Sequence, residues 1–139
     1  MERYKSWIER GKSSLEISKI AINKNIYYED LCYQSQQAVE KGLKGLLIYY
    51  NIEPDFTHNI GMLLDELARF ILIPEHIKEA NNLTKYAVIT RYPGEYEEIT
   101  KEKHEESIKI AHDCLEWIEK TIKECEDNKK QEKNSPPGP

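Results

Sequence analysis

The chain has 139 residues, of which 32% are charged and 39% are hydrophobic, and its formal net charge is −5. This length suits one domain with its own core and is short for two. The acidic balance disfavours sequence-independent binding to duplex nucleic acid, which needs a basic surface. Because no apolar stretch is long enough to cross a bilayer and the first residues lack a signal-peptide pattern, we expect a cytoplasmic protein with no membrane association.

Cysteine usage predicts neither a disulfide framework nor a zinc site. The three cysteines, Cys32, Cys114 and Cys125, are odd in number and form no Cys-x-x-Cys pair. We expect Cys114 and Cys125 to act as small core residues, and we expect no metal and no cofactor.

Apolar residues recur at alternating spacings of three and four, which predicts helices along most of the chain. The first is expected over residues 2–23 and the second over residues 27–50, before the turn at Pro54. Within the second helix, Gly42 and Gly45 each cost roughly 1 kcal/mol of helix propensity. We therefore expect a neighbouring helix to approach closely at these glycines.

Three further helices are predicted in the second half of the chain. The third follows Thr57, an expected N-cap, and the fourth begins near Pro74. The fourth must end before Pro93, because the residue that precedes a proline is disfavoured in helical conformation. The last helix is expected to begin after a second N-cap, Thr100, and to end near Cys125.

These elements predict an all-α fold, an up-and-down bundle of four to five helices. We expect the helical domain to cover residues 1–125. Residues 126–139 contain no apolar side chain except prolines, so we expect a disordered polar tail there.

The second helix carries a glutamine pair, an alanine and then Glu-Lys-x-Leu-Lys. A Thr-His-Asn-Ile turn follows, and an Arg-Tyr-Pro-Gly turn precedes the last helix. The residues of these motifs are Gln36, Gln37, Ala38, Glu40, Lys41, Leu43, Lys44, Thr57, His58, Asn59, Ile60, Arg91, Tyr92 and Pro93. Together the motifs resemble the signature of the HEPN family, which usually has aspartate where Asn59 stands.

The resemblance implies a helical bundle that commonly forms a homodimer and often acts beside a minimal nucleotidyltransferase. Many members of the family are metal-independent ribonucleases, in which an arginine is followed four to six residues later by a histidine. Arg91 stands at the arginine position, but positions 96–98 hold Tyr96, Glu97 and Glu98. The usual histidine is therefore missing from this chain.

Arg91 is the leading candidate for a functional residue. It precedes Tyr-Pro-Gly-Glu, which fits a type II turn with Tyr96 on its other side. A guanidinium at such a turn can bind a phosphate through two hydrogen bonds, whereas the simpler interpretation is that it caps the preceding helix. Tyrosine, with a reference pKa of about 10, is a poor general base, so His104 is the candidate base of a ribonuclease.

Two further hypotheses concern Tyr96 and His58. In some relatives the partner enzyme transfers AMP to a tyrosine near this turn, so Tyr96 is a candidate acceptor, although it occupies the histidine position of that motif. His58 belongs to the Thr-His-Asn-Ile turn and is a candidate ligand-binding residue. The alternative for His58 is a hydrogen bond within its own turn.

The resemblance implies, as the leading function, a toxin-type or accessory subunit that binds a nucleotide or RNA phosphate and partners a minimal nucleotidyltransferase. The ligand-binding residues would be Arg91, Tyr96 and His58. One alternative is a metal-independent endoribonuclease with Arg91, Tyr96 and His104 as its catalytic residues. The other is a structural dimerisation module without a ligand.

Overall fold

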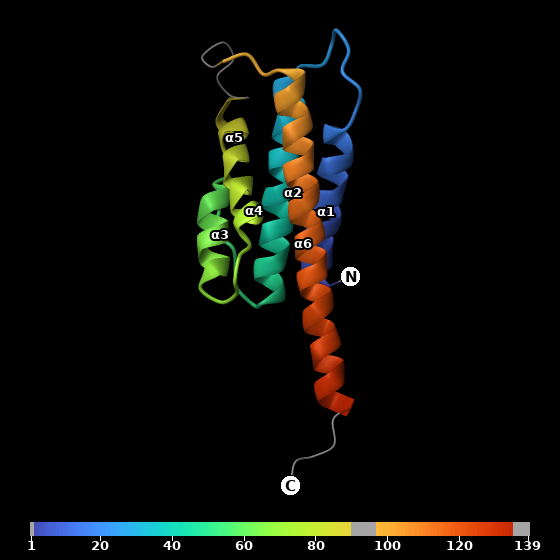
Figure 1. Cartoon of the computed structure of the whole chain (residues 1–139), viewed down its shortest axis with the longest axis vertical. Helices are drawn as coiled ribbons and strands as arrows, with labels where there is room; N and C mark the ends of the chain where they lie inside the picture. Colours follow the sequence, from blue (N-terminus) through green and yellow to red (C-terminus); the bar gives the residue numbers. More distant parts are fainter. Residues whose placement is uncertain (1, 90–96, 135–139) are drawn as a thin grey trace.

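The computed structural model describes residues 2–89 and 97–134, and every regular element in these ranges is helical. The predicted all-α class is confirmed. The elements are α1 (Arg3–Ser18), α2 (Tyr28–Tyr49), α3 (Ile60–Ala68), α4 (Glu75–Lys78), the 3₁₀ helix η1 (Glu79–Leu83), α5 (Lys85–Ile89) and α6 (Lys101–Asn134). Figure 1 shows the long helices α1, α2 and α6 side by side, with the shorter helices α3, α4 and α5 grouped beyond α2.

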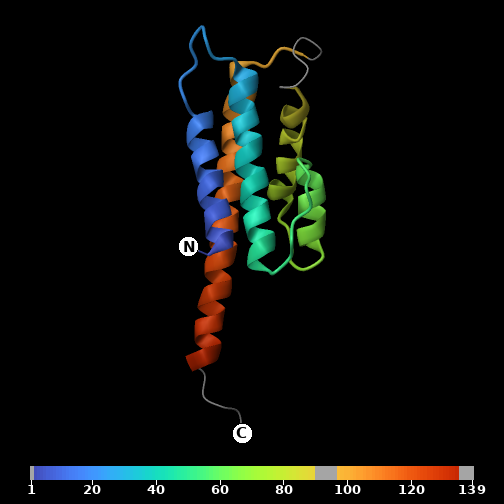
Figure 2. The ribbon, with the colours of Figure 1, turned by 180° about the vertical axis from the view of Figure 1, so that it is seen from behind.

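The core is organised around α2, which contacts α1, α3, α5 and α6. Its side chains Leu43, Leu46 and Leu47 have no exposed surface, because apolar residues cover more than one side of this helix. Seen from behind, α2 lies between α1 and the short helices, and α6 lies behind α1 and α2 (Figure 2).

Glycine allows the close helix contacts that we expected along α2. A Cβ atom at Gly42 would lie 2.6 Å from Leu115 Cδ2 of α6, and one at Gly45 would lie 2.9 Å from Ile8 Cγ1 of α1. Both distances are shorter than van der Waals contact, so α1 and α6 approach α2 only because these side chains are absent. The expectation from the sequence is confirmed.

Two boundaries differ from the sequence-based expectations, and at each a side chain bonds a backbone group. The helix α1 ends at Ser18, not near residue 23, and the Ser18 hydroxyl donates back to the Leu15 carbonyl at 2.6 Å. The N-cap of α3 is Asn59, whose Oδ1 accepts from Met62 N at 3.1 Å. Thr57 lies two residues earlier, where its hydroxyl accepts from Asn59 N at 3.0 Å.

The predicted fourth helix is divided into α4, η1 and α5. At the division, Asn81 Oδ1 accepts from Gly61 N at 2.9 Å, and Thr84 Oγ1 accepts from Ile60 N at 3.0 Å. These bonds satisfy two backbone donors at the first turn of α3. The segment from α4 to α5 is therefore not one regular helix, and it is hydrogen-bonded to the start of α3.

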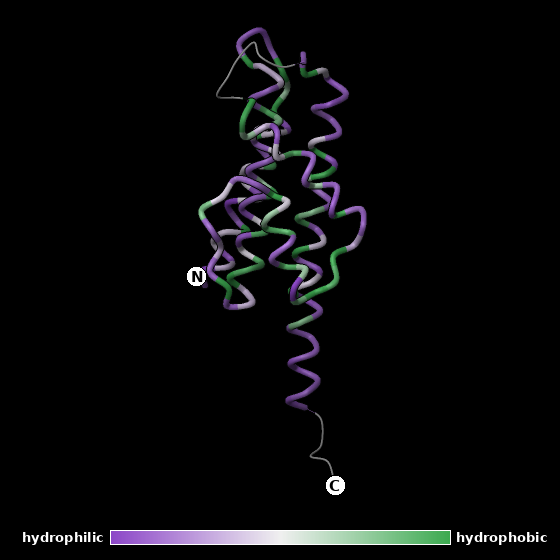
Figure 3. Tube along the Cα trace, turned by 90° about the vertical axis from the view of Figure 1, so that its left-hand side faces the viewer, coloured by the Kyte–Doolittle hydropathy of each residue, from purple (hydrophilic) through white to green (hydrophobic). Residues whose placement is uncertain are grey.

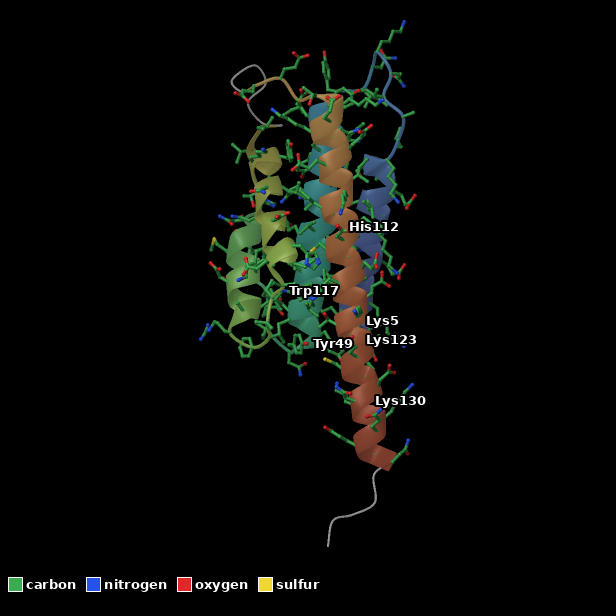
Figure 4. All side chains as sticks on the ribbon, viewed as in Figure 1. Lys5, Tyr49, His112, Trp117, Lys123 and Lys130 are labelled. Atoms are coloured by element: carbon green, nitrogen blue, oxygen red, sulfur yellow. The ribbon has the colours of Figure 1, made fainter. Side chains whose placement is uncertain are left out.

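The last helix is longer than expected and continues to Asn134, through most of the stretch that we expected to be a disordered tail. Tyr49 at the end of α2 donates to Glu126 Oε1 at 2.6 Å, and Lys129 Nζ donates to the Tyr49 hydroxyl at 3.3 Å. Figure 4 shows Tyr49 beside the part of α6 that leaves the bundle and Lys130 beyond the end of the bundle. The projecting part is strongly hydrophilic (Figure 3).

No helix in the described part of the chain combines the length and the apolar character needed to cross a membrane.

Candidate functional site

Arg91 and Tyr96 lie outside the described residues, so their proposed roles remain predictions. The elements on either side of them are described. The end of α5 and the start of α6 lie at the same end of the bundle, where α2 also begins (Figure 1). Thr100 Oγ1 accepts from Lys103 N at 3.2 Å, which confirms Thr100 as the N-cap of α6.

His104 is buried in the first turn of α6, with 8% of its surface exposed. Its Nε2 atom lies 2.6 Å from the carbonyl oxygen of Ser18, the last residue of α1, and its ring centre lies 5.4 Å from that of Tyr28 on α2. Because a carbonyl oxygen can only accept, Nε2 carries the proton in this contact. His104 therefore joins three helices, and a base at this residue would have to act through Nδ1.

His58 belongs to a different group of side chains, which gathers around the carboxylate of Glu40 on α2. Glu40 is 4% exposed and accepts four hydrogen bonds. His58 Nδ1 lies 2.8 Å from Glu40 Oε1, and Lys44 Nζ lies 3.2 Å from Glu40 Oε2. Two glutamine side chains complete the set, with Nε2–Oε1 distances of 3.2 and 3.4 Å. We call this group the Glu40 cluster, made of Gln36, Gln37, Glu40, Lys44 and His58.

The cluster explains how a carboxylate is kept in the core. A buried charge needs an opposite charge and satisfied hydrogen bonds, and here Lys44 supplies the first while the amides and the imidazole supply the second. The Gln36 amide also donates to the His58 carbonyl at 3.0 Å, so both the ring and the backbone of His58 are tied to α2. The expected alternative for His58, a bond within its own turn, is replaced by contacts with another element.

The cluster also sets the chemistry of the His58 ring. With Nδ1–H donating to Glu40, the neutral ring presents Nε2 as its hydrogen-bond acceptor, and 53% of the side chain is exposed. A carboxylate that orients an imidazole in this way fixes its tautomer and direction. His58 can therefore accept a proton or a hydrogen bond from a ligand.

The candidate residues that the structure describes are not all brought together. His58 contacts the Glu40 cluster in the middle of α2, whereas His104 contacts the end of α1 and the start of α2. Sequence reasoning missed Glu40 as the centre of a cluster. The available signal was its spacing of four from both Gln36 and Lys44, which places three polar side chains on one face of a largely apolar helix.

The described residues contain no group of three or more His, Cys, Asp or Glu side chains placed to hold a metal ion. Cys32 and Cys114 are buried, and burial raises the pKa of the Cys114 thiol to about 12. Cys114 packs as a small core residue, as expected, whereas Cys125 is only partly buried.

The protein is a helical bundle whose central helix, α2, carries a buried row of Gln36, Glu40 and Lys44. The family model described as HEPN domain matches residues 4–121, and the chain belongs to this family. The structure thus agrees with the family resemblance of the sequence motifs.

Named relatives are similar over most of their length. The protein named "Putative toxin MJ1304" from Methanocaldococcus jannaschii is 32% identical over 136 residues, covering 86% of this chain and 88% of the relative. Among solved structures, ST0689, described as an archaeal HEPN homologue, has 32% identity and a TM-score of 0.69, covering 88% of this chain and 99% of its own. TT1696 from Thermus thermophilus has 29% identity and a TM-score of 0.75, covering 86% and 98%.

Proposed function

We propose that this chain is a toxin-type or accessory HEPN subunit that binds a nucleotide or RNA phosphate through Arg91 and acts beside a minimal nucleotidyltransferase. The observation that carries the proposal is the likeness, over 86% of the chain, to the relative named "Putative toxin MJ1304". Membership of the HEPN family supports the same role. A homodimer in the cytoplasm is part of the proposal.

The proposed phosphate ligand follows from the chemistry of arginine. A guanidinium binds phosphate through two parallel charge-assisted hydrogen bonds, which a lysine cannot reproduce. The segment that contains Arg91 joins α5 to the start of α6, and these two ends are held by the buried side chains of Ala87 and Ile99. Tyr96 and His58 are the further ligand-binding residues of the proposal.

Titration calorimetry with AMP, ATP and a short single-stranded RNA tests phosphate binding by the purified chain. We expect Arg91→Ala to weaken binding at least tenfold and Arg91→Lys to restore only part of it. Arg69→Ala, which removes an exposed arginine after α3, is the matched control. Equal affinity of wild type and Arg91→Ala would overturn the role of Arg91.

Co-purification with a minimal nucleotidyltransferase from the same genome tests the partner, and incubation of both proteins with ATP tests Tyr96 as an AMP acceptor. Mass spectrometry should then find AMP on a peptide that contains Tyr96 and no modification in Tyr96→Phe. An unmodified wild-type chain would end the acceptor hypothesis, and failure to form a complex would end the partnership.

The endoribonuclease remains the second candidate function, and the oriented, half-exposed imidazole of His58 is the observation that favours it. Purified chain should cleave RNA in the presence of a chelator, and His58→Ala should abolish cleavage. His112→Ala, at an exposed histidine of α6, is the matched control. His104→Gln tests the other candidate base independently of His58. Intact RNA with the wild-type chain would reject this function.

A further inference from the structure

A pocket of about 400 Å³ opens where α1 and α2 pack together. Figure 2 shows these two helices side by side, with α6 behind them. The described residues that line the pocket carry three cations, a hydroxyl and an indole ring, and none of them is a carboxylate. The lining residues are Arg3, Ser6, Trp7 and Arg10 from α1 and Lys41 from α2.

Two of the three cations have no carboxylate partner in the part of the chain that the structure describes. Arg3 is paired through two hydrogen bonds of 2.7 Å with Glu53. Arg10 forms no ion pair with a described residue, and Lys41 Nζ donates to the Ser14 hydroxyl at 2.9 Å. The neighbouring Glu40 forms no hydrogen bond or ion pair with Lys41, and its oxygens accept from the other members of the Glu40 cluster.

Lys41 is also half-buried. Burial is the largest influence and lowers the pKa of Lys41, the charge of Glu40 raises it, and the charge of Arg10 lowers it by less. An anion in the pocket would offset both the desolvation of this ammonium and its repulsion from Arg10. In a chain with a net charge of −5, two adjacent unpaired cations form a distinct local positive site.

Trp7 adds a surface for a planar group. The ring is partly exposed and lines the pocket, and the Lys44 ammonium lies 5.8 Å from its centre. An indole can stack on a planar ring, as it does in proteins that bind bases. The pocket volume lies within the range of small-molecule sites, roughly 300–1,000 Å³.

We infer that this pocket, which we call the α1–α2 pocket, binds a phosphate monoester attached to a planar ring, with Arg10 and Lys41 holding the phosphate and Trp7 stacking on the ring. A nucleoside monophosphate has this chemistry. The α1–α2 pocket consists of described residues and does not include Arg91, so it is a second site that stands independently of the proposed function.

The test uses the full chain, with AMP, ribose 5-phosphate and inorganic phosphate as probes in calorimetry. In Arg91→Ala, where this pocket is the AMP site that remains, we expect AMP to bind best, and a further Arg10→Gln or Lys41→Gln to weaken it at least tenfold. Trp7→Leu should weaken AMP and leave inorganic phosphate unchanged. Lys12→Gln, which removes a cation of α1 that pairs with Glu119 outside this pocket, is the matched control.

The site of binding is read directly from the indole N–H resonance of Trp7, assigned by its loss in Trp7→Leu. AMP should shift this resonance in wild type and in Arg91→Ala, but not in Arg10→Gln. Circular dichroism confirms that each variant is folded, and Lys41→Arg should retain binding if Lys41→Gln lowers stability. No shift with AMP in wild type, or an AMP affinity that only Arg91→Ala reduces, would overturn the inference. Phosphate affinity that is independent of Arg10 and Lys41 would overturn it as well.

Discussion

Replacing Glu40 by glutamine removes the negative charge of the Glu40 cluster while keeping the shape of the side chain. Lys44 then keeps a buried ammonium, with 9% of its side chain exposed, opposite a neutral amide. Breaking a buried ion pair by removing one partner costs about 3–5 kcal/mol. The Trp7 ring remains near the Lys44 ammonium, so we expect a loss near the lower end, about 3 kcal/mol.

For a domain of this size, that loss corresponds to a decrease in the melting temperature of about 10 °C. Urea denaturation followed by circular dichroism measures the free energy of unfolding, and a thermal scan measures the melting temperature. Glu16→Gln is the control, because it removes an exposed ion pair with Lys19 at 3.3 Å and should change stability far less. The double variant Glu40→Gln with Lys44→Met should recover part of the loss, since no buried ammonium remains.

A free energy of unfolding for Glu40→Gln within about 1 kcal/mol of wild type would refute the reasoning. The carboxylate would then contribute no more than an ordinary neutral hydrogen bond, and the orientation of His58 would need another explanation.

Three further predictions concern α6 and the cysteines. Tyr49→Phe removes the hydroxyl that contacts Glu126, so hydrogen exchange of residues 126–134 should become faster while exchange in α2 stays unchanged; equal exchange would contradict this anchor. The Tyr49 contact also lowers the pKa of Glu126, so its contribution is present above the ordinary carboxyl pKa and is lost as the pH falls through the lowered value. The same segment should therefore exchange faster, relative to the rest of α6, in acid than at pH 7, and a segment equally protected at both would argue against the linkage. Iodoacetamide at about pH 8 should label the partly exposed Cys125 before Cys114, whose thiol is buried with a pKa of about 12, as measured by peptide mass spectrometry; faster labelling of Cys114 would show that this part of the core opens.

The long helices were predictable because their determinants are local. The bounds expected for the second helix, 27–50, differ by one residue at each end from those of α2. Asn51, which follows the C-cap Tyr50, has a φ of 61°. Thr100 was recognisable as an N-cap for the same reason. The close approach at Gly42 and Gly45 could also be expected, since glycines in a helix interior need a packing reason.

The features that sequence reasoning missed depend on partners far along the chain. The division of the fourth helix follows from the hydrogen bonds that Asn81 and Thr84 each accept from the first turn of α3, about 20 residues earlier in the chain. The extension of α6 depends on Tyr49, which is 77 residues away from its partner Glu126. Helical periodicity carries no information about either contact.

The candidate sites divide in the same way. The row of polar side chains in the Glu40 cluster can be read from the spacing within one helix, but the involvement of His58 requires the path of the chain after α2 to be known. The α1–α2 pocket could not be predicted from the sequence, because Arg10 and Lys41 come close together only when the two antiparallel helices pack.

The projecting end of α6 makes this helix a rigid spacer. The 34 residues of the whole of α6 correspond to about 51 Å of helix. The 22 residues of α2, which begins at the same end of the bundle, correspond to about 33 Å. A fluorophore or fused protein attached near residue 134 would therefore be held roughly 18 Å beyond the end of α2. Energy transfer between such a label and one at the opposite end of α6 would report the length of this arm in solution.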